Sequence, residues 1–101
     1  MQYLGALALA LSIASAAPAS ENLARKYNCL ACHQAERRSV GPSYQDIAAQ
    51  YQDQADAAAR VAERIKRGSV GVWGRIPMPP NPRIPDADLE ALTAWILEMA
   101  E

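Results

Sequence analysis

Apolar residues recur at helical spacing in four stretches of this chain, and the stretches between them are polar or rich in proline. Side chains three and four residues apart share one face of a helix, so this spacing is the main sequence signal for an amphipathic helix. It predicts helices over residues 21–32, over a short stretch that opens at Ser43, over residues 53–67 and over residues 86–99. Because no stretch reads convincingly as a strand, we expect an all-α fold.

Each predicted helix has one apolar face that should be buried. In chain order these faces consist of Leu23, Ala24, Tyr27 and Ala31; of Tyr44, Ile47, Ala48 and Tyr51; of Ala57, Ala58, Val61, Ala62 and Ile65; and of Leu89, Leu92, Ile96 and Met99, with Trp95 beside the last.

The predicted boundaries follow from capping residues. Ser43, with Asp46 three residues later, forms a variant of the capping box at the start of the second helix. Gly68 should stop the third helix, and Asp86 should cap the last one. The connections are then residues 34–42 and residues 69–85, and the second of these is stiffened by five prolines.

Residues 1–19 read as a secretory signal peptide. They carry no charged side chain, and an apolar run over residues 3–13 is followed by small-residue cleavage patterns. We expect cleavage after Ala19, which leaves one domain over residues 20–101. An uncleaved anchor is the alternative, but the run is short for a membrane span and is diluted by serines.

The net charge and the length of the chain limit the classes of function that it can have. The formal net charge is −1 for 101 residues, which argues against a nucleic-acid-binding protein. The charges are unevenly placed: all ten Lys and Arg lie between Arg25 and Arg83, whereas residues 84–101 contain five acids and no base. A mature chain of about 80 residues buries a modest core and often needs a covalent or metal staple.

The segment Asn28-Cys29-Leu30-Ala31-Cys32-His33 supplies such a staple. Cys-x-x-Cys-His is the attachment signature of c-type haem, in which Cys29 and Cys32 bind the porphyrin and His33 binds the iron. A zinc site fits less well because it needs four ligands. A thioredoxin-like dithiol is usually found in a βαβ unit, and no stretch of this chain reads convincingly as a strand. A plain disulfide between the two cysteines also remains possible.

A haem iron has a second axial position, and Met78 is the best candidate for it. His33 is the only histidine, and the methionines are Met1, Met78 and Met99. Met1 leaves with the signal peptide, and Met99 lies on the apolar face of a helix. Met78 lies in a proline-stiffened loop, where a rigid backbone would hold a weak iron–sulfur bond; a gap-filling surface methionine is the alternative.

Further motifs follow the haem-attachment segment in order: Val40-Gly41-Pro42, Tyr44-x-Asp46-Ile47-Ala48-Ala49, Gly71-Val72-Trp73-Gly74, Ile76-Pro77-Met78-Pro79-Pro80-Asn81 and a last helix with Trp95. Together they resemble the small class I bacterial cytochromes c of the cytochrome c-551 type. The resemblance covers nearly all of the chain after Ala19. It implies four short helices around one covalently attached haem, and a role as an electron carrier. Asn28 departs from the family's usual Gly, and Arg75 from its usual Pro.

The resemblance also implies roles for further residues. Ala24 should let the first helix approach the last one closely, near Leu92 and Trp95, and other residues should help to bind the haem. The carbonyl of Pro42 should accept the ring N–H of His33, and Asn81 should donate to the Met78 sulfur. Trp73 and Arg64 should hydrogen-bond a haem propionate, with Arg64 lying nearer the apolar side of its helix than its neighbours. A snorkelling Arg64 and ordinary loop roles for Pro42 and Asn81 are the alternatives.

These expectations make the chain a periplasmic, monomeric electron carrier rather than an enzyme, because two axial side chains leave the iron no open site. The family implies a bc-type complex as donor and a terminal oxidase, nitrite reductase or peroxidase as acceptor. Two alternatives stay open: a haem sensor or peroxidase-like protein in which Met78 dissociates, and a haem-free dithiol protein. No membrane span is expected after cleavage of the signal peptide.

Overall fold

A computed structural model describes residues 17–100 of the chain. Four α-helices make up most of this part: α1 (Ala17–Lys26), α2 (Tyr44–Tyr51), α3 (Ala57–Arg67) and α4 (Asp86–Leu97), with a short 3-10 helix, η1 (Cys29–Ala31), after α1. Within these residues there is no strand beyond an isolated antiparallel bridge between Ser69 and Met78. The predicted all-α fold is confirmed.

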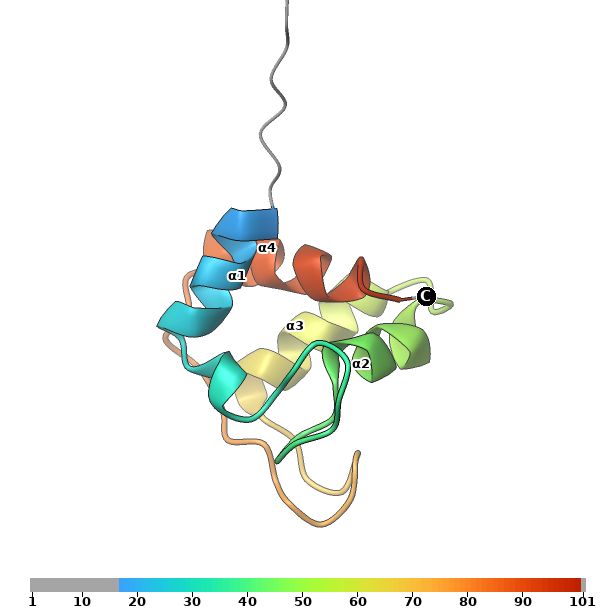
Figure 1. Cartoon of the computed structure of the whole chain (residues 1–101). Coiled ribbons are helices and arrows are strands. Elements are labelled where there is room, and N and C mark those ends of the chain that lie inside the picture. Colours follow the sequence, from blue (N-terminus) through green and yellow to red (C-terminus); the bar gives the residue numbers. More distant parts are fainter. Residues whose placement is uncertain (1–16, 101) are drawn as a thin grey trace, which may run out of the picture.

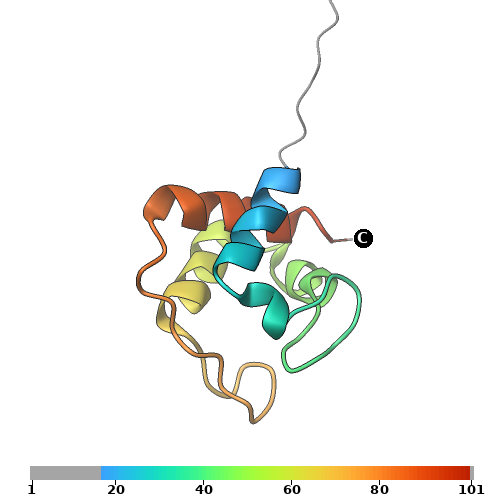
Figure 2. The same cartoon turned by 60° about the vertical axis from the view of Figure 1, so that its left-hand side comes forward.

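Helix α4 is the common packing partner of the other helices, because α1, α2 and α3 all contact it. Its buried face of Leu89, Leu92 and Ile96 meets Val61 and Ile65 of α3 in one apolar cluster. Helix α1 crosses α4 in both views (Figure 1, Figure 2), and Ala24 is 0% exposed in the same cluster. The absence of a larger side chain at Ala24 therefore suits a close approach of the two helices, as the sequence predicts.

A polar contact also joins α1 to α4. The Tyr27 hydroxyl donates a hydrogen bond of 2.6 Å to Oδ2 of Asp88, a contact that the sequence did not predict. This hydrogen bond to a carboxylate raises the pKa of Tyr27, because the phenol loses a proton less readily beside a negative charge.

Three helix boundaries differ from the prediction by four residues or more. Helix α1 starts at Ala17 rather than at residue 21. Helix α1 ends at Lys26 rather than at Cys32, because Asn28 adopts a left-handed conformation (φ 63°) that no helix can continue through. Ala31, predicted to be buried, is exposed as a result. Helix α3 starts at Ala57 rather than at residue 53, because Ala57 N–H closes a turn on the Gln54 carbonyl before the helix begins.

The other boundaries agree better with the sequence. Ser43 caps α2 by accepting a 3.0 Å hydrogen bond from the Asp46 N–H, and Gly68 (φ 78°) ends α3. Helix α4 ends at Leu97, and its capping position is Pro85 rather than Asp86, which is its first residue. Met99 lies beyond the helix and is half-buried, so it still packs against the core.

Two long connections leave the helices on the side opposite α4 (Figure 1, Figure 2). The first, residues 34–43, follows the Cys-x-x-Cys-His segment. The second, residues 68–85, joins α3 to α4 and contains Met78. The fold thus brings the loop that follows His33 and the loop that contains Met78 to one end of the molecule.

Candidate haem-binding site

The Cys-x-x-Cys-His segment forms one tight turn after α1. The left-handed Asn28 redirects the chain, and the N–H groups of Cys32 and His33 then donate to the Cys29 carbonyl at 3.1 and 3.0 Å. Cys29 and Cys32 are free, half-buried thiols, and both line the same cavity as His33. A single turn thus presents two thiols and an imidazole to one space.

The His33 ring is held from two sides. Nδ1 lies 2.8 Å from the Pro42 carbonyl oxygen, which can only accept, so Nδ1 carries the proton and Nε2 keeps its lone pair. Gly41 lies against the ring, because a Cβ added there would be 2.6 Å from Cε1 of His33. The predicted hydrogen bond between His33 and Pro42 is confirmed, and it leaves Nε2 suited to bind a metal.

Met78 lies at the base of the second loop, where the backbone is well anchored. Its N–H donates to the Ser69 carbonyl at 2.9 Å, and its carbonyl accepts from the Ser69 N–H at 3.1 Å. Gly68 is needed beside this pair, since a Cβ there would lie 2.4 Å from the Met78 carbonyl oxygen. The half-buried Met78 side chain lines the cavity together with Cys29, Cys32 and His33.

The predicted hydrogen bond from Asn81 to the Met78 sulfur is wrong for this structure. Nδ2 of Asn81 donates instead to the carbonyl oxygens of Ile65 at 3.2 Å and Pro79 at 3.3 Å. An amide has two N–H donors, so both are used. Backbone carbonyls are stronger acceptors than a thioether, and Asn81 fastens the loop to the end of α3 rather than holding the sulfur.

The cavity measures about 1020 Å³, including the space at its mouth. Its walls are mainly apolar and include Tyr51 from α2, Val61 and Ile65 from α3, and Leu92 and Ile96 from α4. Trp73, Arg64 and Arg38 also line it. The structure therefore brings together every predicted site residue except Asn81, which is not among the lining residues.

Arg64 differs from the prediction in its burial. It is exposed rather than leaning toward the core, although its side chain lines the cavity. Within residues 17–100 its guanidinium makes neither a hydrogen bond nor an ion pair, whereas Arg60 and Arg67 on the same helix pair with Asp56 and Glu63. Arg64 lies in the last turn of α3, and a long side chain there reaches solvent easily, so helical position alone overestimates its burial.

Two features of the site escaped the sequence analysis. The Arg38 guanidinium donates a 3.0 Å hydrogen bond to the Trp73 carbonyl oxygen and so links the two loops. The buried Tyr44 lies between His33 and Trp95, at ring-centroid distances of 5.5 and 5.2 Å, and its hydroxyl has no partner within the described residues. The helical spacing of apolar residues predicts that Tyr44 is buried. No local pattern predicts the contact between Arg38 and Trp73, which are 35 residues apart.

These donors fit c-type haem. Two thiols on one turn can each form a thioether, the imidazole offers Nε2, and the mainly apolar cavity suits a porphyrin face. A family model for cytochrome c matches residues 19–100 of the chain. The chain belongs to the cytochrome c family. This cytochrome carries one haem c, which the family binds covalently.

Curated relatives agree with the family. The cytochrome is 54% identical to cytochrome c-552 of Nitrosomonas europaea over 98 residues, which covers 96% of this chain and 95% of the relative. It is 46% identical to cytochrome c-551 of Allochromatium vinosum over 88 residues, or 87% of this chain and 94% of that one. The resemblance to the small class I cytochromes c is therefore confirmed.

Solved structures show the same fold. The crystal structure of wild-type Nitrosomonas europaea cytochrome c552 superposes with a TM-score of 0.75 at 57% identity, covering 78% of this chain and 98% of that one. The class I cytochrome c fold predicted from the sequence is thus confirmed, and the relatives are electron carriers.

Proposed function

We propose that this cytochrome shuttles single electrons in the periplasm through a low-spin haem with His33 and Met78 as axial ligands. One observation carries the proposal. His33 and Met78 are 45 residues apart in the sequence, yet both line one cavity together with Cys29 and Cys32. The haem supplies a one-electron Fe(III)/Fe(II) couple. The chain's part is to hold the ring, fill the axial positions and exclude water.

Thioether formation at both Cys29 and Cys32 is supported by their common turn and their free thiols. Burial raises the pKa of the Cys29 thiol. A reactive dithiol needs a lowered thiol pKa, so this environment does not favour the haem-free redox alternative.

Within residues 17–100 no cluster of three or more His, Cys, Asp or Glu is arranged to hold a metal ion.

Axial ligation by Met78 is supported by its anchored backbone and its place in the cavity wall. A thioether binds iron weakly, so the loop must hold it in place with little strain. With His33 and Met78 both bound, the iron has no position for a substrate. This arrangement favours an electron carrier over an enzyme or a sensor.

Trp73 and Arg64 are proposed to bind a haem propionate. Both line the cavity, and Arg64 offers a guanidinium without a partner among the described residues. A propionate would supply the anion that such a group prefers. Arg38 also lines the cavity and adds positive charge at the same rim.

The periplasmic location rests on the sequence of residues 1–19, most of which lie outside the described residues. A signal peptide cleaved after Ala19 would leave a domain over residues 20–101 that is exported before the haem is attached. Over residues 17–100, no helix is both long and apolar enough to cross a membrane. We propose that the mature cytochrome is a monomer.

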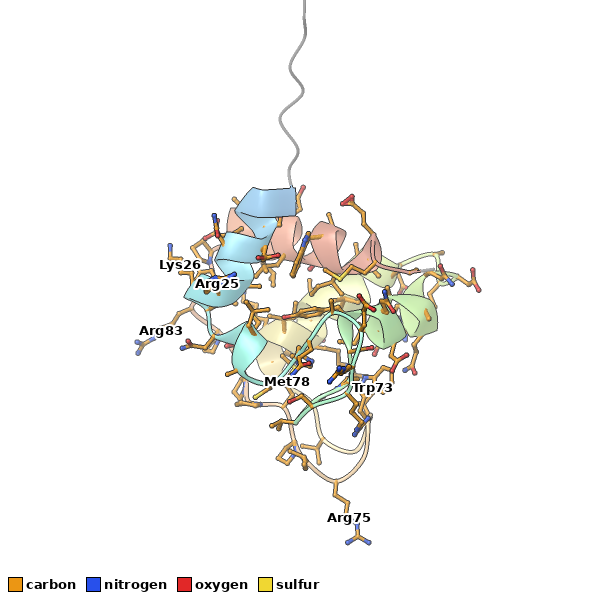
Figure 3. All side chains as sticks on the ribbon, viewed as in Figure 1. Arg25, Lys26, Trp73, Arg75, Met78 and Arg83 are labelled. Atoms are coloured by element: carbon orange, nitrogen blue, oxygen red, sulfur yellow. The ribbon has the colours of Figure 1, made fainter. Side chains whose placement is uncertain are left out.

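The proposed partners are other redox proteins: a bc-type complex as donor and a terminal oxidase, nitrite reductase or peroxidase as acceptor. Support comes from the surface beside the cavity. Val40, Val70 and Ile76 are large apolar side chains that are 48%, 81% and 64% exposed. Arg37, Arg38 and Arg75 lie in the same loops, and Arg75 projects from the loop tip in Figure 3. An apolar contact with basic residues around it fits an acidic partner.

An optical spectrum of a periplasmic extract tests the proposal. The reduced protein should show the sharp bands of a low-spin c-type haem, and the pigment should stay with the polypeptide during acid–acetone extraction. A Cys32→Ala variant should retain at most one thioether. A high-spin ferric spectrum would favour the sensor alternative, and a colourless protein would favour the dithiol.

A further inference from the structure

The outer part of the Met78 loop, residues 70–77, is almost free of hydrogen bonds. Within the described chain no backbone–backbone hydrogen bond involves any of these residues, and Val70 is 81% exposed. The base of the loop is different, since Ser69 pairs with Met78 and the Asn81 N–H donates to the Ile65 carbonyl at 3.0 Å. A segment with so few bonds opens at low free energy unless something else restrains it.

Arg38 supplies that restraint. Its Nη2 donates to the Trp73 carbonyl oxygen at 3.0 Å, and among residues 17–100 this is the hydrogen bond that ties residues 70–77 to another part of the chain. Trp73 and Met78 line the same cavity, and both are labelled above the loop tip that carries Arg75 in Figure 3. The bond therefore restrains the loop on the side of the cavity where Met78 lies.

The segment that carries Arg38 is itself anchored. The Gly41 N–H donates to the Cys32 carbonyl at 2.8 Å, and the Tyr44 N–H donates to the Gln34 carbonyl at 2.9 Å. The His33–Pro42 hydrogen bond fastens the same loop from inside. Arg38 thus joins a poorly restrained segment to one that is fixed at both ends.

We propose that Arg38 is a clasp that holds the Met78 loop closed and so limits access to the sixth coordination position of the iron. The inference rests on the proposed axial role of Met78. Arg38 does not bind the iron; it is a positioning residue that acts through the Trp73 carbonyl. A guanidinium suits this task because its charge strengthens a hydrogen bond to a carbonyl and its planar group is easily oriented.

The test measures how fast imidazole replaces Met78 on the ferric holoprotein at saturating imidazole, when loop opening limits the rate. Imidazole is used at about pH 8, where most of it is neutral, so its binding is insensitive to the charge of the surface. The variants are Arg38→Gln and, as the matched control, Arg37→Gln. Arg37 is the adjacent exposed residue, and it makes no hydrogen bond or ion pair within residues 17–100, so its loss removes the same charge without the clasp.

Arg38→Gln should raise the rate at which saturating imidazole replaces Met78 about 5-fold or more, which corresponds to the loss of one hydrogen bond. Arg37→Gln should stay within about 2-fold of the wild type, and Arg38→Lys should lie between the two because lysine can still donate one hydrogen bond. Global unfolding by denaturant is measured in parallel, and Arg38→Gln should change it much less than it changes the rate.

Two failures are distinguishable. If the wild-type ferric protein lacks the far-red band of methionine ligation, the proposed axial role of Met78 fails and the clasp fails with it. If the band is present but Arg38→Gln and Arg37→Gln give the same rate, the clasp alone is wrong. A rate increase that merely follows an equal loss of global stability would also overturn it.

Discussion

The carbonyl oxygen of Pro42 accepts a 2.8 Å hydrogen bond from Nδ1 of His33, and this bond fixes which imidazole nitrogen is left for the proposed bond to iron. Because Nδ1 is protonated, the lone pair is on Nε2, and the ring cannot rotate without breaking the bond. The local sequence explains why the two groups meet: Gly41 brings the backbone so close to the ring that a side chain would not fit.

Gly41→Ala should therefore disturb His33 directly. The new Cβ would lie 2.6 Å from Cε1 and 2.9 Å from Nδ1, so either the ring or the loop must move. We expect the holoprotein to lose about 1–3 kcal/mol of stability, as in other overpacked sites, together with a changed haem spectrum. Gly71→Ala is the control, because nothing lies within 4 Å of its Cβ although its φ of 78° strains the backbone. It should leave the spectrum unchanged, and an equal spectral change in both variants would contradict this account.

Tyr27→Phe should weaken the junction of α1 and α4 in a pH-dependent way. The hydrogen bond to Asp88 raises the pKa of Tyr27, so the folded state favours the protonated phenol. This contribution is fully present below the ordinary tyrosine pKa of about 10 and is lost as the pH rises through the higher folded value. Wild-type stability should therefore fall more steeply than that of the variant above about pH 10.

Denaturant unfolding between neutral and alkaline pH checks this prediction. A double-mutant cycle with Asp88→Ala isolates the pair, since each single change removes one of the two partners of the hydrogen bond. Parallel stability curves for the wild type and Tyr27→Phe across this range would show that the contact does not contribute.

The haem-attachment motif, the cap at Ser43 and the stop at Gly68 were predictable because each depends on a few adjacent residues. The extent of the first helix was not, since the alanines and leucines around Cys29 suit a helix and only the conformation of Asn28 ends it. Asn28 stands where the family usually has Gly, and that substitution was the available signal for a left-handed residue.

Contacts between distant segments were the least predictable part of the site. Asn81 was expected to donate a hydrogen bond to the Met78 sulfur. Folding instead brings the Ile65 carbonyl oxygen, a stronger acceptor, within reach of the Asn81 amide, and the hydrogen bond forms there. The bonds of Arg38 and Tyr27 likewise depend on where two separate elements end up. A single sequence contains no periodicity that encodes such pairs.

Charge reversal at Arg75 should slow the reduction of an acidic partner. Arg75 is exposed at the tip of the Met78 loop, whereas Arg83 lies on the side of the molecule near α1 in Figure 3. Arg75→Glu should lower the second-order rate, and the wild-type rate should fall with salt because exposed charges are screened over about 10 Å at 0.1 M ionic strength. Stopped-flow kinetics over a salt series provides the measurement.

Arg83→Glu is the matched control for the docking surface. It makes the same change of charge and should leave the rate nearly unchanged. Rates that are independent of salt, or equal in the two variants, would mean that the apolar residues around the cavity alone guide the contact.

Replacement of Met99 should affect folding but not the iron. Its half-buried side chain packs against the core beyond the end of α4, so Met99→Ala should cost about 1–2 kcal/mol, less than a fully buried methionine. The far-red charge-transfer band of the ferric protein should remain. This variant therefore provides the comparison for the proposed ligand.

The most direct test of the account is the far-red absorption of the ferric holoprotein in Met78→Ala beside Met99→Ala. The account predicts that Met78→Ala loses the band, opens the sixth position to water or imidazole and lowers the reduction potential, because a thioether favours ferrous iron more than water does. Each 59 mV of that drop changes the electron-transfer equilibrium tenfold. Loss of the band in Met99→Ala, with the band intact in Met78→Ala, would contradict the axial assignment and with it the proposed function.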